Sequence, residues 1–152
     1  MSEFHTSLAE AKQSIIDEFS LFDDWIDRYE YIIELGRNLS GLDEAYRIDQ
    51  YKVKGCQSQV WFRAHQEAGR VTFEADSDAM IVRGLIALLL RVYSGRTPSE
   101  ILETPPDFLD AVDLGSHLSG SRANGLAAMV NHIQSYARSF EGNNSVAPTS
   151  TP

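Results

Sequence analysis

Apolar residues recur at helical spacing in two segments near the start of the chain. Over residues 7–19 they lie three or four positions apart, and Ser7 is placed to cap the first turn. A second stripe of aromatic and aliphatic residues, including Trp25, follows over 23–35. Core packing is the ordinary explanation for such a stripe. The pattern predicts two amphipathic helices.

The middle of the chain changes to the pattern of β-strands. Residues 59–65 are rich in β-branched and aromatic side chains, 67–69 have the composition of a hairpin turn, and 71–73 predict the return strand. Residues 51–53 alternate briefly, which predicts a third short strand. We therefore expect a meander of two or three antiparallel strands.

Helical patterns return after the strands. The most apolar stretch, residues 80–92, predicts a buried helix that ends near Gly95. Further helices are predicted from 97, over 108–112 and over 121–140. Because runs of helix and runs of strand do not alternate, the fold class is α+β, with a small antiparallel sheet packed against helices. Residues 1–140 are expected to form a single domain.

Composition and charge exclude several classes of function. The chain has 152 residues, one cysteine and a formal net charge of −9. One cysteine excludes an internal disulfide framework and a zinc or iron–sulfur site held by three or four cysteines of this chain. The negative charge argues against binding to nucleic acid and against an anionic membrane surface. Residues 141–152 are polar and aperiodic, which predicts a disordered tail.

The charge is unevenly distributed. Residues 1–50 carry 12 acidic and 4 basic side chains, whereas 51–100 carry 5 acidic and 7 basic ones. The N-terminal segment has neither the basic start nor the apolar run of a signal peptide. We therefore expect a cytoplasmic protein, in a compartment where a free thiol stays reduced.

Cys56 is the first candidate for chemistry. It lies between two strand-like segments, preceded by Gly55 and flanked by Lys52 and Lys54. Nearby cations lower the pKa of a thiol and favour the reactive thiolate, whereas a lone cysteine is often an inert, buried small side chain. The residues alone leave both interpretations open.

Three charged residues have competing explanations. Asp76 and Asp78 precede the buried helix, where capping of its first turn explains them better than acid–base catalysis. Arg122 lies near the start of the last helix, where a cation opposes the helix dipole. Either Arg122 binds an anionic group from outside the chain or, as the more ordinary explanation, it pairs with a carboxylate of the chain itself. No histidine has the spacing of a metal site.

The cysteine segment resembles that of the SufE family of sulfur-acceptor proteins. The resemblance covers about residues 8–140 and includes later segments in the same order. It rests on Val53-Lys54-Gly55-Cys56-Gln57-Ser58-Gln59-Val60-Trp61, Asp76-Ser77-Asp78-Ala79, Ile81-Val82-Arg83-Gly84-Leu85, Tyr93, Thr97-Pro98 and Ser121-Arg122-Ala123-Asn124-Gly125-Leu126.

The resemblance implies a fold similar to the IscU scaffold and a role in iron–sulfur cluster assembly. Cys56 would accept persulfide sulfur from a pyridoxal-phosphate cysteine desulfurase of the SufS or CsdA type, stimulate that enzyme, and pass the sulfur to a SufBCD-type complex. It further implies that Arg122 stabilises anionic sulfur and that Asp78 restrains the cysteine loop by capping. The pyridoxal phosphate would belong to the partner, so no cofactor is expected in this chain.

Three other classes of function stay open at this point. A cysteine-dependent enzyme would pair Cys56 with a histidine and turn over without a partner protein. A pure interaction module would use Cys56 only structurally. A metal scaffold comes last, since one cysteine and scattered histidines make a poor site.

Overall fold

The chain begins with two capped helices. A computed structural model describes residues 7–150, and their side chains except those of 115, 116 and 142–150. Helix α1 (Leu8–Phe19) begins at Ser7, whose hydroxyl accepts a hydrogen bond from the Glu10 backbone in a capping box. Helix α2 (Trp25–Arg37) begins at Asp24, which caps the Asp27 backbone. Both helices agree with the sequence pattern.

Two short 3₁₀ turns and a two-stranded sheet follow. The turns are η2 (Glu44–Tyr46) and η3 (Asp49–Tyr51), and the antiparallel strands are β1 (Val60–Glu67) and β2 (Arg70–Ser77). The hairpin turn has positive φ at Ala68 and Gly69, as a tight turn between twisted strands requires.

The third strand predicted over 51–53 is absent from the described residues. Tyr51 ends η3, and Lys52 makes only an isolated bridge to Trp61. The chain reaches Lys52 directly from the 3₁₀ turn. The residues before Lys52 therefore do not continue the pairing with β1, and the single bridge does not extend into a ladder. The lower of the two expected strand numbers is therefore correct, and the α+β class is confirmed.

Helix α3 (Met80–Tyr93) is the central element of the core. Nine of its residues are buried, and it packs against α2 and β2. A Cβ at Gly84 would overlap the carbonyl oxygen of Ile32, so glycine permits the close crossing of α2 and α3. None of the described helices has the length and apolarity needed to cross a bilayer.

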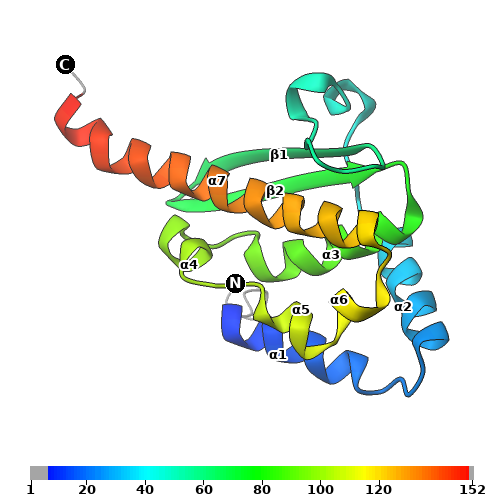
Figure 1. The fold of residues 1–152 in the computed structure, drawn as a ribbon. Helices are drawn as coiled ribbons and strands as arrows, with labels where there is room; N and C mark the ends of the chain where they lie inside the picture. The colour runs from blue at the N-terminus through cyan, green and yellow to red at the C-terminus, as the bar shows by residue number, and fades with distance from the viewer. Residues whose placement is uncertain (1–6, 151–152) are drawn as a thin grey trace.

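The C-terminal part contains three short helices and one long one. These are α4 (Pro98–Leu102), α5 (Asp107–Ala111), α6 (Leu114–His117) and α7 (Gly120–Ser150). Figure 1 shows α7 running across the sheet, with α1 and α2 at the opposite side of the molecule. The rings of His132 and Tyr136 on α7 contact those of Phe62 and Phe73 on the strands. Helix α7 therefore covers one face of the sheet.

Helix α7 is longer than the sequence predicts. The expected end is at residue 140, but the helical backbone continues to Ser150. Glu141, the first residue of the predicted tail, accepts a hydrogen bond from Ser99 Oγ at 2.9 Å, which ties it to α4. The domain boundary at 140 and the disorder of the remaining tail stay predictions, and residues 1–6 and 151–152 lie outside the described part.

Candidate functional site

The cysteine loop is a closed turn between the 3₁₀ segment and β1. Its base is a backbone hydrogen bond from Val53 N to Val60 O, 2.8 Å long. Gly55 has φ +91°, a conformation that L side chains rarely adopt. A Cβ at Gly55 would lie 3.3 Å from Ala128 Cβ, so the loop closely approaches α7. Local backbone geometry thus holds Cys56 beside that helix.

Cys56 is half-buried, and its thiol faces a backbone carbonyl. The Sγ atom lies 3.6 Å from the Gly125 oxygen on α7, within the range for a weak S–H hydrogen bond. Burial raises the pKa of the Cys56 thiol. The flanking lysines would favour a thiolate, but in this conformation desolvation disfavours that charged form. The resting cysteine is therefore a protonated thiol at neutral pH.

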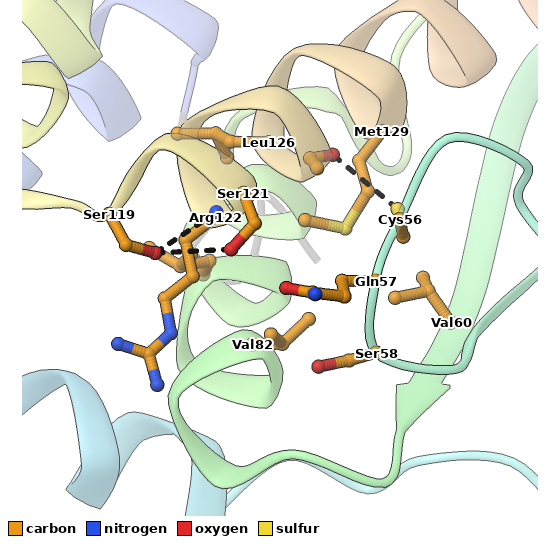
Figure 2. A pocket seen from close by; sticks show the side chains of 12 residues that line it. Cys56, Gln57, Ser58, Val60, Val82, Ser119, Ser121, Arg122, Leu126 and Met129 are labelled. Carbon is orange, nitrogen blue, oxygen red and sulfur yellow. Dashed lines mark hydrogen bonds between the residues drawn. The ribbon is translucent and has the colours of Figure 1, made fainter.

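A cavity of about 240 Å³ opens beside the sulfur. Its walls come from the cysteine loop, α3, the residues before α7 and the first turns of α7 (Figure 2). The lining residues are Cys56, Gln57, Ser58, Val60, Val82, Leu85, Ser119, Ser121, Arg122, Gly125, Leu126 and Met129. Segments far apart in sequence therefore form one hollow, with a mixed polar and apolar lining.

Arg122 lies in the wall of this cavity, so the structure brings it together with Cys56. In Figure 2 the guanidinium extends away from the sulfur, and the Gln57 side chain lies between the two. Arg122 forms no ion pair with the residues whose side chains are described, which disfavours the explanation that a carboxylate of the chain holds it. The exposed side chain is free to rotate.

The two aspartates do not cap α3, contrary to the sequence interpretation. The N-cap residue is Ala79, without a side-chain cap, because β2 continues to Ser77. Asp78 instead accepts hydrogen bonds from the Gln59 backbone N–H (3.1 Å) and side-chain amide (3.4 Å). Asp78 thus fixes the end of the cysteine loop, through contacts across the start of the hairpin. Asp76 belongs to a separate buried ion cluster.

Removing the Asp78 carboxylate should loosen the loop. Asp78→Ala deletes both side-chain bonds to Gln59 and keeps the backbone bond from Asp78 N to the Gln59 oxygen. If the shorter deleted bond, at 3.1 Å, dominates and contributes about 1 kcal/mol, the opening equilibrium changes about fivefold. We expect Cys56 to react about fivefold faster with iodoacetamide at constant pH. Ser121→Ala, in the cavity wall but without contact to Gln59, is the control and should leave the rate unchanged. An unchanged rate in Asp78→Ala would show that the Asp78 carboxylate does not hold the loop.

No histidine of the described residues lines the cavity beside Cys56. His65 lies in β1, His117 stacks on Trp25 with ring centroids 4.0 Å apart, and His132 packs against aromatic rings. Burial lowers the pKa of His132. His5 lies outside the described residues. Among the described residues, the geometry therefore does not favour a cysteine–histidine enzyme.

Metal binding finds no support in the described part of the chain. No group of three or more histidine, cysteine, aspartate or glutamate side chains there is placed to hold an ion. The chemistry that the site supports is that of a single sheltered thiol.

The sequence interpretation missed the contribution of α7 to the cavity. Leu126 and Met129 are apolar and buried, and the residue type of Gly125 does not by itself indicate chemistry. Together with Arg122 these residues follow the i, i+3, i+4, i+7 pattern of one helix face. This spacing was the available signal that the arginine and the carbonyl beside Cys56 lie on the same side of α7.

Comparison with known proteins now decides the family. A family profile described as SufE, an Fe-S metabolism associated domain, matches residues 13–137. The chain belongs to the SufE family. The resemblance seen in the cysteine segment is confirmed, and with it a role in iron–sulfur metabolism.

SufE-like relatives cover most of the chain. An uncharacterised SufE-like protein of Rhizobium meliloti is 47% identical over 128 residues, which is 81% of this chain and 91% of that protein. One from Synechocystis is 40% identical over 84% of this chain and 80% of its own length. The chloroplastic/mitochondrial SufE-like protein 1 of Arabidopsis thaliana is 41% identical over 85% of this chain and 35% of its own length.

A solved structure shares the fold. The solution structure of a hypothetical protein from Thermus thermophilus has a TM-score of 0.70 and 21% identity, and the match covers 85% of this chain and 94% of that one. This likeness supports the α+β architecture of the SufE-family chain.

Proposed function

We propose that this SufE-family protein is a sulfur acceptor and carrier for a pyridoxal-phosphate cysteine desulfurase of the SufS or CsdA type. The Cys56 thiolate attacks the terminal sulfur of the desulfurase's cysteine persulfide. A new S–S bond forms on Cys56, the S–S bond of the partner breaks, and the partner's cysteine leaves as a thiolate. Sulfur is transferred without an external oxidant or reductant.

The position of Cys56 is the observation that carries the proposal. The chain's sole cysteine lies on a loop of the SufE domain, half-buried at the edge of a cavity. No second thiol of this chain can attack the persulfide, so the sulfur is kept until an acceptor protein takes it. A SufBCD-type cluster-assembly complex is the acceptor that we propose.

The resting geometry suits a carrier that is activated by docking. A protonated, half-buried thiol is a poor nucleophile, because the thiolate is the attacking species. Docking must therefore move the loop away from the Gly125 carbonyl and allow the thiol to lose its proton. Removal of the persulfide sulfur then frees the desulfurase for another turnover, which explains how the protein stimulates that enzyme.

Intact-protein mass spectrometry tests the proposal directly. The protein is incubated with a SufS-type desulfurase and cysteine, and it should gain sulfur that a reductant removes. The desulfurase should also turn over faster in its presence. If the mass is unchanged while the desulfurase is active and binds the protein, the sulfur-acceptor function is wrong.

Replacing Arg122 should slow the transfer. The guanidinium can rotate toward the sulfur, and a hydrogen bond to a charged group contributes about 1.5–3 kcal/mol. Since 1.4 kcal/mol is a factor of ten, Arg122→Ala should lower the single-turnover transfer rate at saturating desulfurase about tenfold or more. Arg122→Lys, which keeps the charge, should restore part of the rate. Equal rates in wild type and Arg122→Ala would remove Arg122 from the transfer step.

A further inference from the structure

A second hollow lies beside the cysteine loop, on the other side of its contact with α7. It has a volume of about 400 Å³ and is lined by Lys52, Val53, Lys54, Ala128, Asn131, His132 and Ser135. We call it the lysine groove. Its boundary with the cysteine cavity is the close approach of Gly55 to Ala128. Both hollows therefore border the same loop.

The backbone aims two cations at this groove. Lys52 is extended, with φ −75° and ψ 136°, and Val53 between the two lysines is buried. Alternate residues of an extended chain point to the same side, so Lys52 and Lys54 both face away from the core. Both are exposed, and both line the groove.

Lys52 and Lys54 have no ion partner among the side chains that the structure describes. No described carboxylate forms an ion pair with Lys52 or Lys54, whereas Arg47, Arg63 and Arg83 all have one. These two unpaired charges occur in a chain of net charge −9, whose first 50 residues hold 12 acidic and only 4 basic side chains. Two positive charges without a described ion partner therefore lie close to Cys56, in a chain that is acidic as a whole.

We infer that the lysine groove binds an acidic segment of the desulfurase, with partner carboxylates placed against Lys52 and Lys54. This inference rests on the proposed function. Lys54 precedes Cys56 by two residues, so their Cα atoms lie within about 7 Å. A partner that reaches the sulfur therefore comes close to Lys54, which lines this groove. The rest of the chain carries net negative charge and repels the same acidic surface, which favours an approach of the partner at the two lysines.

The Asn131 amide and the Ser135 hydroxyl supply hydrogen-bond donors along the groove wall. A carboxylate accepts such bonds, so the lining can position an acidic side chain as well as attract it. A basic or purely apolar partner segment would have neither the electrostatic attraction to the lysines nor the hydrogen bonds from Asn131 and Ser135.

The test is a binding titration with the purified SufS-type desulfurase from the same genome, without cysteine, so that no sulfur is transferred. The variant Lys52→Gln with Lys54→Gln removes two positive charges and keeps polar side chains. Arg70→Glu changes the net charge by the same amount at the far end of the hairpin, where Arg70 is the cross-strand partner of Glu67 and its side chain lies 3.8 Å from the Glu100 carboxylate. Thermal unfolding of each variant verifies that it is folded.

We expect the double lysine variant to bind about tenfold more weakly at about 0.01 M salt, where the Debye length is about 30 Å. The difference should disappear at about 1 M salt, where charges are screened beyond about 3 Å. Arg70→Glu should weaken binding less than about twofold. Equal effects of the two variants, a difference that persists at high salt, or unchanged binding would each overturn the inference.

The sulfur-acceptor proposal is judged by a different measurement. At saturating desulfurase with cysteine present, the lysine variant should reach the same final extent of Cys56 persulfide as wild type. If wild type gains no sulfur but the lysines still govern binding, the transfer proposal fails and the groove assignment stands.

Discussion

Cys56→Ser should give a protein that folds normally and takes up no sulfur. Serine has no sulfur atom with which to form a persulfide, so the loss of acceptance is complete rather than partial. The native thiol makes only a weak hydrogen bond, with Sγ 3.6 Å from the Gly125 oxygen. A single hydrogen bond contributes about 1 kcal/mol, so even its complete loss should change the free energy of unfolding by no more than about 1 kcal/mol.

Mass spectrometry after incubation with desulfurase and cysteine measures the loss, and urea unfolding measures stability. Ser58→Ala is a matched control, because Ser58 belongs to the same loop and lines the same cavity. The control should gain sulfur as wild type does. The third measurement is the turnover of the desulfurase, which Cys56→Ser should no longer stimulate.

Other outcomes separate the competing functions. Full stimulation by Cys56→Ser would favour an interaction module in which the cysteine is structural. Turnover of a substrate by wild type alone, without desulfurase, would favour a cysteine-dependent enzyme. The cavity beside Cys56 offers no described histidine as its general base, so we expect neither result.

The local elements were the most predictable part of the fold. Capping residues and helical spacing located α1, α2 and α4, because Ser7, Asp24 and Thr97 each satisfy backbone groups within their own turn. The hairpin turn is likewise predictable from the local composition of residues 67–69. Helix α6 was missed, since its four residues are too few to show a period.

Features that depend on distant contacts were not predictable in the same way. Asp76 and Asp78 stand where caps are common, but their partners come from other segments, Asp78 binding Gln59 and Asp76 binding Arg47. Lys52 and Trp61 meet at one bridge, which a short alternating pattern cannot distinguish from a strand. The position of Arg122 against the helix dipole suggested an anion, the resemblance to SufE proteins linked it to sulfur, and only the fold placed it in the cysteine cavity.

Replacing Asp76 should cause the largest loss of stability. Its carboxylate is fully buried and pairs with both Arg83 and Arg47, and it also accepts a hydrogen bond from Leu42 N (3.0 Å). Arg83 in turn donates to the carbonyls of Gly36 and Leu39. The cluster thus joins β2, α3, the end of α2 and the connection that leads toward the cysteine loop.

The charge of Asp76 holds this cluster together. Burial alone would raise the pKa of Asp76, but backbone hydrogen bonds from Leu42 and Ser77 and the nearby Arg83 and Arg47 outweigh it and lower the pKa below its usual value. Removing one partner of a buried ion pair typically costs about 3–5 kcal/mol, because the other charge stays buried and uncompensated. Asp76→Asn keeps the shape and removes the charge, so we expect a loss of about 3 kcal/mol near neutral pH.

The control is Glu74→Gln. Glu74 forms a cross-strand ion pair with Arg63 close to the Asp76 cluster. That pair has the same N–O distance of 2.6 Å as Arg47–Asp76, but its side chains are 31% and 44% exposed. An exposed pair contributes less than about 1 kcal/mol, so Glu74→Gln should be nearly neutral. Urea unfolding gives the free energy of unfolding of both variants. Similar losses would show that burial does not increase the contribution of the Asp76 charge to stability.

The pH dependence gives an independent check on the same cluster. A carboxyl whose pKa is lower in the folded than in the unfolded state stabilises the protein fully above the unfolded value, which is about 3.9 for aspartate. That stabilisation is lost as the pH falls through the folded-state pKa. Asparagine does not titrate, so the stability difference between wild type and Asp76→Asn should be largest near neutral pH and shrink below about pH 4. A difference that stays constant into the acid range would mean that lost packing, rather than the lost charge, destabilises the variant.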